Sequence, residues 1–155
     1  MIVGIDPGLT GAIAFLDGES YFVEDMPVMA RGKGAGKVKN QVNPSELYTL
    51  LAMRGVKLAC VERVSSMPGQ GVAGVFSLGD TFGCIRGVIA AIGIPLELVT
   101  PQKWKKYYNI GSDKEIVRAR AIERFPKAEL SRKKDHNRSE ALLIARYAQM
   151  NLVDK

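Results

Sequence analysis

The sequence of 155 residues contains only two cysteines, Cys60 and Cys84, and no apolar run long enough to cross a membrane. The cysteines lie in apolar stretches without the spacing of a metal site, so they indicate small buried side chains and exclude a disulfide scaffold. A membrane span requires about 18 unbroken apolar residues. The N-terminus also lacks the basic region and the longer apolar run of a signal peptide. We therefore expect a cytoplasmic protein without a membrane partner.

Positive charge is in excess, because 22 Lys and Arg residues face 16 Asp and Glu residues and give a net charge of +6. Such a balance favours a polyanionic partner over an acidic protein surface. The hydrophobic content of 46% can supply the core of one unit. No internal repeat or linker divides the chain, so we predict a single domain over residues 1–155.

The first strand-like run ends on a carboxylate, Asp6, which Pro7 and Gly8 follow at once. A second apolar run, Ala12 to Leu16, leads into Asp17-Gly18, a strong signal for a tight hairpin turn. A third strand is expected from Ser20 to Glu24. Asp6 is therefore predicted to lie in a sheet and not in a tail.

A second acid follows a later strand. The segment from Ala30 to Val42 is rich in glycine and basic residues and is predicted to be a flexible basic loop. Asn43 then caps a helix with proline at its first position, and Gly55 closes it. The apolar run from Lys57 to Val61 is predicted to be a buried strand, and Glu62 follows it directly.

The C-terminal half alternates helices with one more strand, which makes the chain an α/β protein. We expect a long helix over Val72–Ile92 with Gly93 as its C-cap, a strand at Leu96–Val99, a short helix opened by Thr100-Pro101, a helix with a capping box of Ser112 and Glu115, and a last helix over His136–Met150.

Acids at Asp6, at Glu62 and at Glu140 near the start of the last helix suit one kind of chemistry. A hard divalent cation takes oxygen ligands, and two such ions about 4 Å apart can promote phosphodiester cleavage. Each acid taken alone is better explained by a cap, a salt bridge or exposure to water, and it is the coincidence of several that favours a metal site.

Two glycine-rich stretches do not support a nucleotide cofactor. The segment GKGAGK, residues 32–37, has three residues between its outer glycines where a P-loop needs four, and Val38 replaces the required Ser or Thr. The segment DPGLTG resembles the phosphate loop of actin-like ATPases, but no second phosphate motif completes a nucleotide cleft.

The motifs together resemble one family. The stretches are GIDPGLTGA at the first strand, VERV at Val61–Val64, P-x-x-W-K at Pro101–Lys105 and EALLIARYA in the last helix. They resemble the RuvC-type Holliday junction resolvases of the ribonuclease H-like superfamily, in particular its compact phage-type relatives. The resemblance spans nearly the whole chain and implies a ribonuclease H-like fold, with a mixed central sheet of three antiparallel N-terminal strands and then parallel strands, flanked by helices.

The resemblance also implies an activity. It suggests a magnesium-dependent endonuclease, with manganese as a plausible substitute and two ions per site, that acts in DNA recombination and repair. It would cut four-way DNA junctions as a homodimer by paired symmetric nicks that leave 5′-phosphates. The apolar surface of Val72–Ile92 agrees with a dimer. A nuclease for other branched DNA or RNA-DNA hybrids, and a catalytically inert junction-binding protein, remain open alternatives.

Residue by residue, Asp6, Glu62 and Glu140 match the catalytic metal-binding acids of the family. The family usually has an acid or histidine three residues before the last acid, and this chain departs from that pattern with Asn137. We take Asp135 as the fourth catalytic and metal-binding acid, with an N-cap role as its alternative. His136 is the runner-up, as a ligand, a proton shuttle or an exposed first-turn residue.

Contacts with DNA are expected chiefly from basic side chains, because phosphates dominate affinity. The candidates are Lys33, Lys37, Lys39, Lys103, Lys105, Lys106, Lys114, Arg132, Lys133 and Lys134. Met67 or Phe76 could form a wedge at the junction centre, although Phe76 is equally suited to the core. Trp104 could stack on a base or anchor its helix as a buried residue.

Overall fold

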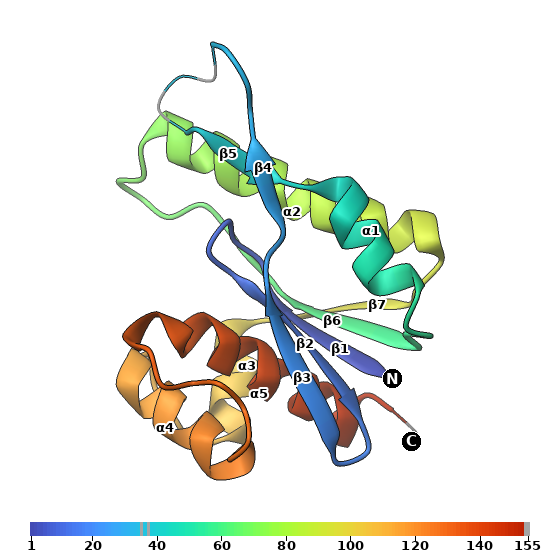
Figure 1. Cartoon of the computed structure of the whole chain (residues 1–155). Helices are drawn as coiled ribbons and strands as arrows, with labels where there is room; N and C mark the ends of the chain where they lie inside the picture. The colour runs from blue at the N-terminus through green and yellow to red at the C-terminus, as the bar shows by residue number, and fades with distance from the viewer. Residues whose placement is uncertain (35, 37, 154–155) are drawn as a thin grey trace.

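A mixed five-stranded sheet with helices on both faces forms the centre of the computed structural model, which describes residues 1–34, 36 and 38–153 (Figure 1). The strand order is β3-β2-β1-β6-β7. The strands are β1 (Ile2–Asp6), β2 (Ala12–Asp17), β3 (Ser20–Asp25), β6 (Leu58–Glu62) and β7 (Leu96–Val99). The first three are antiparallel, and β6 and β7 run parallel to β1. The predicted mixed sheet is therefore confirmed.

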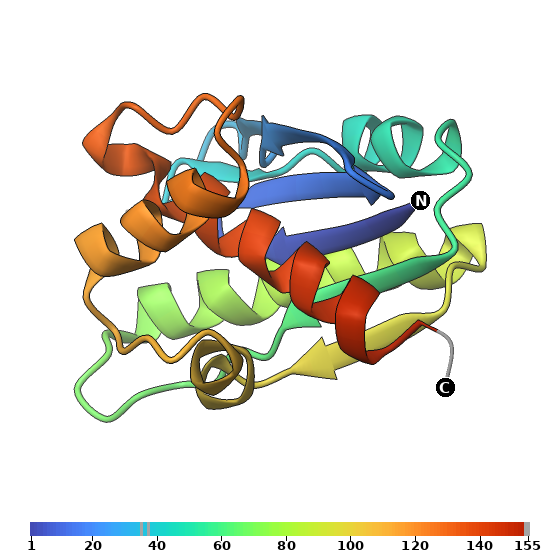
Figure 2. The ribbon, with the colours of Figure 1, turned by 90° about the horizontal axis from the view of Figure 1, so that it is seen from below.

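The helices form a layer on each face of the sheet (Figures 1 and 2). One face carries α1 (Pro44–Ala52) and α2 (Val72–Ile92), and the other carries α3 (Pro101–Tyr107), α4 (Lys114–Arg124) and α5 (His136–Asn151). A short 3₁₀ helix, η1 (Lys133–Asp135), leads directly into α5. The chain thus places two separate apolar cores on a single sheet.

Alternation along the central strands divides their side chains between the two cores. Val3 and Ile5 of β1 join the core under α1 and α2, whereas Ile2 joins the core under α5. Successive residues of a strand point to opposite faces, so a sheet buried on both sides needs apolar residues at nearly every position. This requirement explains the near-continuous apolar runs of β1 and β2.

Gly4 sets the distance between β1 and α5. A Cβ atom built on Gly4 would lie 2.3 Å from the backbone nitrogen of Ala145 and 2.4 Å from the carbonyl oxygen of Ala141. No other residue fits, since backbone atoms of a packed helix cannot move aside as a side chain can. The close approach brings the first half of α5 directly over the end of β1.

The prediction of a flexible basic loop over Ala30–Val42 is wrong at both ends. A two-stranded sheet forms there from β4 (Val28–Ala30) and β5 (Asn40–Val42). Arg31, which follows β4, forms an ion pair with Asp80 of α2, with 2.6 Å between the guanidinium and the carboxylate. This contact joins the hairpin to α2. β5 is short and mostly polar, so its pairing with β4 had no clear signal in the local sequence.

Helix boundaries were predicted to within a few residues, with two corrections. Asp113, and not Ser112, caps α4 by accepting hydrogen bonds from the backbone N–H groups of Glu115 and Ile116. The first helix ends at Ala52, before Gly55, which has a φ of +59° in the following turn. Thr100 caps α3 and Gly93 caps α2, as predicted.

Helix α2 covers the sheet with only a narrow stripe. Its buried residues are Ser77, Thr81, Ile85 and Ile89. Within the part of the chain that the structure describes, it is the one helix long and apolar enough to cross a membrane by length and composition, and 22% of the residues in that apolar stretch are buried. A large part of an apolar helix is therefore left uncovered.

Candidate metal centre

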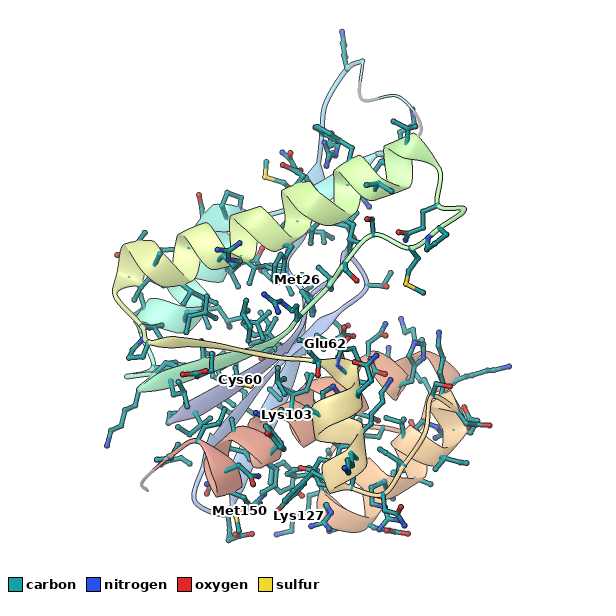
Figure 3. All side chains as sticks on the ribbon, turned by 180° about the vertical axis from the view of Figure 1, so that it is seen from behind. Met26, Cys60, Glu62, Lys103, Lys127 and Met150 are labelled. Carbon is teal, nitrogen blue, oxygen red and sulfur yellow. The ribbon has the colours of Figure 1, made fainter. Side chains whose placement is uncertain are left out.

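Asp6 and Glu62 are the last residues of neighbouring parallel strands. The register pairs Ile5 of β1 with Val61 of β6, so the two acids follow at the same edge of the sheet. Adjacent strands lie about 4.8 Å apart. Glu62 is found where the sheet ends, between the helices of its two faces (Figure 3). Strand pairing alone thus holds the first two carboxylates side by side.

Glu140 reaches the same place from α5. It precedes Ala141, whose carbonyl oxygen is one of the atoms closest to Gly4. The tight contact between α5 and β1 therefore brings Glu140 to the carboxyl end of β1. One possible ligand atom from each of Asp6, Glu62 and Glu140 lies within 4.8 Å of the others. The structure brings together the three acids that the sequence motifs indicated.

The three acids make an unfavourable electrostatic site on their own. Burial raises the pKa of Asp6 well above its ordinary value, and the nearby charges of Glu140 and Glu62 raise it further. Burial also raises the pKa of Glu62. The positive charges of Lys105 and Lys114 oppose the rise at Asp6. Carboxylates that are crowded and partly desolvated in this way are stabilised as anions by a bound cation.

Helix α3 contacts two of the three acids through consecutive residues. The indole Nε1 of Trp104 donates a hydrogen bond to Oε2 of Glu62 at 2.7 Å. The Nζ atom of Lys105 lies 3.7 Å from Oε1 of Glu140. The sequence indicated Lys105 only as a contact for DNA, and it placed Trp104 either in the core or against a base. The spacing P-x-x-W-K marked this helix but did not reveal its contacts with the acids.

Trp104 is fully buried, which confirms its role as the anchor of α3. Its ring makes an edge contact with Tyr108, at 6.4 Å between centroids. The Tyr108 hydroxyl in turn donates to the carbonyl of Leu143 in α5 at 2.7 Å. The indole is therefore not available to stack on a nucleic-acid base.

A divalent cation fits this group of acids. Mg²⁺ and Mn²⁺ prefer oxygen ligands, and carboxylates supply them without any movement of the backbone. A cation would also offset the repulsion that raises the pKa of Asp6. Asp6, Glu62 and Glu140 are thus the residues that would hold a metal here.

The structure does not bring Asp135 into this group. Its carboxylate accepts hydrogen bonds from the backbone N–H of Arg132 and from the Arg132 guanidinium, at 2.8 Å each. Burial favours the neutral acid, but these hydrogen bonds outweigh it and lower the pKa of Asp135. In the structure this carboxylate closes the turn before α5, and its assignment as the fourth ligand stays a prediction.

The other two candidates for a fourth ligand also have local partners. The Nδ1 atom of His136 lies 3.2 Å from the carbonyl oxygen of Lys133. The Asn137 amide donates to the carbonyl of Thr10 in the turn after β1. Asn137 therefore ties the start of α5 to the turn that follows Asp6.

Most of the basic residues predicted to contact DNA are exposed. They are Lys33, Lys39, Lys103, Lys106, Lys114, Arg132, Lys133 and Lys134. Lys105 is partly buried beside Glu140, and Arg132 is paired with Asp135. Lys37 lies outside the described residues. Contact of these side chains with DNA stays a prediction.

Two apolar side chains considered as a wedge are also exposed. Met67 is 64% exposed and Phe76 is 67% exposed, which excludes Phe76 from the core. Both lie near the N-terminal end of α2, in the segment that follows Glu62. An apolar side chain this open to solvent remains free to contact a partner.

Known structures decide the fold. A RuvC structure from Thermus thermophilus has a TM-score of 0.58 and 20% sequence identity, and the match covers 96% of this chain and 95% of that chain. T. thermophilus RuvC in complex with a Holliday junction substrate has a TM-score of 0.65 and 18% identity, over 97% of this chain and 96% of that chain. The chain has the RuvC fold. The predicted ribonuclease H-like architecture is thereby confirmed.

No protein-family model and no curated protein matches the sequence. With identities of 18–20%, the RuvC likeness establishes the architecture and not the activity, which depends on the residues of the site. The resemblance to a compact phage-type branch stays a prediction.

Proposed function

We propose that this protein is a metal-dependent, structure-selective endonuclease that cuts four-way DNA junctions. The observation that carries the proposal is the convergence of Asp6, Glu62 and Glu140 within a fold shared with a junction-bound RuvC. The net charge of +6 supports a nucleic-acid partner. In this proposal residues 1–155 form one nuclease domain that works on DNA inside the cell.

The three carboxylates would bind Mg²⁺, or Mn²⁺ in its place, as two ions per site. Such ions supply activation of the attacking water and stabilisation of the leaving oxygen in phosphodiester cleavage. Asp6 and Glu62 hold their positions through strand pairing, and Glu140 does so through the contact of α5 with Gly4. Lys105, 3.7 Å from Glu140, offsets part of the negative charge before a metal binds.

DNA binding is proposed to depend on the exposed basic side chains predicted above, which are Lys33, Lys39, Lys103, Lys106, Lys114, Arg132, Lys133 and Lys134. Their charges would position the phosphate backbone, and they carry no sequence information of their own. Met67, exposed in the segment after Glu62, is proposed to contact the unpaired centre of the junction. The basic residues are proposed because they are exposed, and Met67 because it is exposed and follows Glu62 in the chain.

A homodimer would give the two symmetric nicks that resolve a junction and leave 5′-phosphates. Helix α2 supports this part of the proposal. Cβ atoms built on Gly79, Gly83 and Gly87 would meet nothing within 4 Å, and these glycines recur on one side of an apolar helix. A second copy of the chain could pack closely there, because small residues let helix backbones approach.

The test of dimerisation uses two matched variants. Gly83→Glu places a charge on the uncovered side of α2, and Gly111→Glu places one at another open glycine outside this helix. Sedimentation should find the Gly111→Glu protein as a dimer and the Gly83→Glu protein shifted to monomer. A wild-type protein that stays monomeric at every concentration assayed would contradict the proposed homodimer.

The test of activity uses a labelled four-way junction, a linear duplex and an RNA-DNA hybrid, each with and without Mg²⁺. Wild-type protein should nick the junction in paired positions only when the metal is present. Asp6→Asn and Glu62→Gln should lose cleavage but retain junction binding. The control is Glu97→Gln. Glu97 is an exposed acid on β7, opposite Cys60 of the adjacent strand β6. The Glu97→Gln protein should cut the junction as the wild type does.

Each alternative function predicts a different pattern in the same assay. Preferred cleavage of the RNA-DNA hybrid or of other branched DNA would point to a nuclease with another substrate. Junction binding without any metal-dependent nicking would point to an inert junction-binding protein. Cleavage that survives both Asp6→Asn and Glu62→Gln would reject the assignment of these acids.

A further inference from the structure

The contact between Trp104 and Glu62 joins the end of β6 to helix α3, which follows the neighbouring strand β7. Glu62 ends β6, and Trp104 lies 42 residues later in α3. The indole is fully buried, and its Nε1 donates to Oε2 of Glu62 at 2.7 Å. A buried indole N–H needs an acceptor, and here the acceptor belongs to the cluster of three acids.

The geometry limits what this indole can do. An indole nitrogen is only a donor, so it can neither bind a metal nor take up a proton. Its hydrogen bond occupies one lone pair of a carboxylate that has about four such sites, which leaves acceptor capacity for a cation. The contact can therefore fix the orientation of Glu62 without competing for the whole carboxylate.

The indole is itself held from the other side. The ring of Tyr108 packs against it edge to face, a contact that depends on the ring and not on the hydroxyl. The Tyr108 hydroxyl separately donates a hydrogen bond to the carbonyl of Leu143 in α5, the helix that carries Glu140. Lys105 adds a second contact, since its Nζ lies 5.1 Å from the centre of the indole ring and 3.7 Å from Glu140. The ring is thus wedged between the strand that ends in Glu62 and the helix that bears Glu140.

We propose that Trp104 is a positioning residue that orients the Glu62 carboxylate for a divalent cation shared with Asp6 and Glu140. The inference rests on the proposed metal-dependent function. Hydrogen-bond partners of metal ligands fix ligand orientation, and their loss typically lowers metal affinity by about 10- to 100-fold. A merely structural role for Trp104 predicts a loss of stability and no specific loss of metal affinity.

The first experiment compares two variants that each remove one side-chain hydrogen bond of a buried aromatic residue and keep an aromatic ring. Trp104→Phe removes the bond to Glu62, and Tyr108→Phe removes the bond to Leu143 in the same core. Mn²⁺ is titrated into metal-stripped protein, and free Mn²⁺ is followed by electron paramagnetic resonance. Trp104→Phe should bind Mn²⁺ about 10-fold or more weakly than the wild type, and Tyr108→Phe should stay within about twofold.

Thermal unfolding and junction binding without metal are measured on the same samples. Both variants should retain junction affinity, because neither side chain is exposed to DNA. Equal Mn²⁺ affinity in wild type and both variants would overturn the proposal. So would an equal loss in both variants, since that result follows from general loosening of the core.

The second experiment needs no Trp104 variant, because Trp104 is the single tryptophan of the chain. A negative charge beside the indole nitrogen lowers the energy of the fluorescent excited state. Mg²⁺ at Glu62 should therefore shift the emission of wild-type protein to shorter wavelength in a saturable way. Glu62→Gln should abolish this shift. An emission spectrum that stays constant at Mg²⁺ concentrations that support cleavage would overturn the proposal even if Trp104→Phe fails to fold.

These readouts separate the inference from the function on which it rests. If wild-type protein cuts junctions but Trp104→Phe binds Mn²⁺ as tightly as Tyr108→Phe, only the positioning role fails. If wild-type protein binds Mn²⁺ but cuts no nucleic acid, the proposed activity fails, and the role of Trp104 is judged from the binding curves alone. A wild-type protein that binds no metal would contradict both the proposed activity and the positioning role of Trp104.

Discussion

Replacing Asp6 by asparagine should stabilise the metal-free protein. Asp6 lies with Glu62 and Glu140 in a group whose possible ligand atoms are within 4.8 Å of one another. At that separation two unit charges repel by about 3.5 kcal/mol if the effective dielectric constant is about 20. Asparagine has nearly the same shape and carries no charge, so it removes this repulsion while it keeps the packing.

The stability gained by Asp6→Asn cannot exceed the free energy needed to protonate Asp6 in the folded protein. An acid with an ordinary pKa of 3.8 can be protonated at pH 7 for about 4 kcal/mol, at about 1.36 kcal/mol per pH unit. Lys105 and Lys114 offset part of the repulsion. We therefore expect the free energy of unfolding to rise by about 1 to 4 kcal/mol, which corresponds to about 3 to 12 °C in melting temperature for a chain of this size.

The dependence on pH follows from the direction of the pKa shift. Burial and the neighbouring acids raise the pKa of folded Asp6 above its ordinary value. Below the ordinary pKa, Asp6 is protonated in both the folded and the unfolded protein and does not reduce the free energy of unfolding. As the pH rises through the raised pKa of the folded protein, that free energy falls. The advantage of Asp6→Asn should be largest at pH 7 and should vanish towards pH 4.

The assay is thermal unfolding in a chelator, across this pH range, for wild type, Asp6→Asn and the control Glu97→Gln. Glu97 is exposed on β7, so its replacement should change the melting temperature little. Saturating Mg²⁺ should stabilise wild type and not Asp6→Asn, because only a protein that binds the ion gains from mass action. An Asp6→Asn protein that is no more stable than wild type at pH 7 without metal would refute the reasoning.

Three further predictions concern packing, the turn before α5 and DNA. Gly4→Ala should lower the free energy of unfolding by about 3 kcal/mol or more, because its Cβ would lie 2.3 Å from the Ala145 nitrogen; denaturant unfolding measures this loss. Asp135→Asn should destabilise by about 1 to 2 kcal/mol and leave Mn²⁺ affinity within a few-fold of wild type, whereas a large loss of affinity would restore Asp135 as a ligand. Junction affinity should fall linearly with the logarithm of salt concentration, and Lys133→Gln with Lys134→Gln should lower that slope by up to about 2; an unchanged slope would place both lysines away from DNA.

Much of the fold could be predicted because its signals are local. The apolar runs of β1, β2 and β6 are buried on both faces, and a continuous apolar run needs no partner to be recognised. Capping residues such as Asn43 and Thr100 mark helix starts for the same reason. The errors occur at two kinds of place. Asp113 and Ser112 are both suited to cap α4, and the sequence does not show which one does. The strand β5 depends on its contact with α2, which is distant in the sequence.

The candidate site was predictable as far as its acids end strands or begin a helix. Asp6 and Glu62 each follow an apolar run, and parallel pairing brings such residues to one edge of a sheet. The fourth acid is harder to assign from sequence, because Asp135 has an equally good local partner in Arg132. A sequence shows that an acid is near the site, but it does not show which cation the acid will pair with.

The sequence by itself determined the order of the helices and of the five strands in the central sheet, the excess of positive charge and the three acids, because periodicity, composition and chain position are all local properties. Only the tertiary structure decided that Glu140 joins Asp6, that Asp135 turns away to Arg132 and that Trp104 binds Glu62. These outcomes depend on how closely α5 and α3 approach the sheet. Backbone contacts such as that of Gly4 with Ala141 and Ala145 set this distance, and they join residues more than a hundred positions apart in the chain.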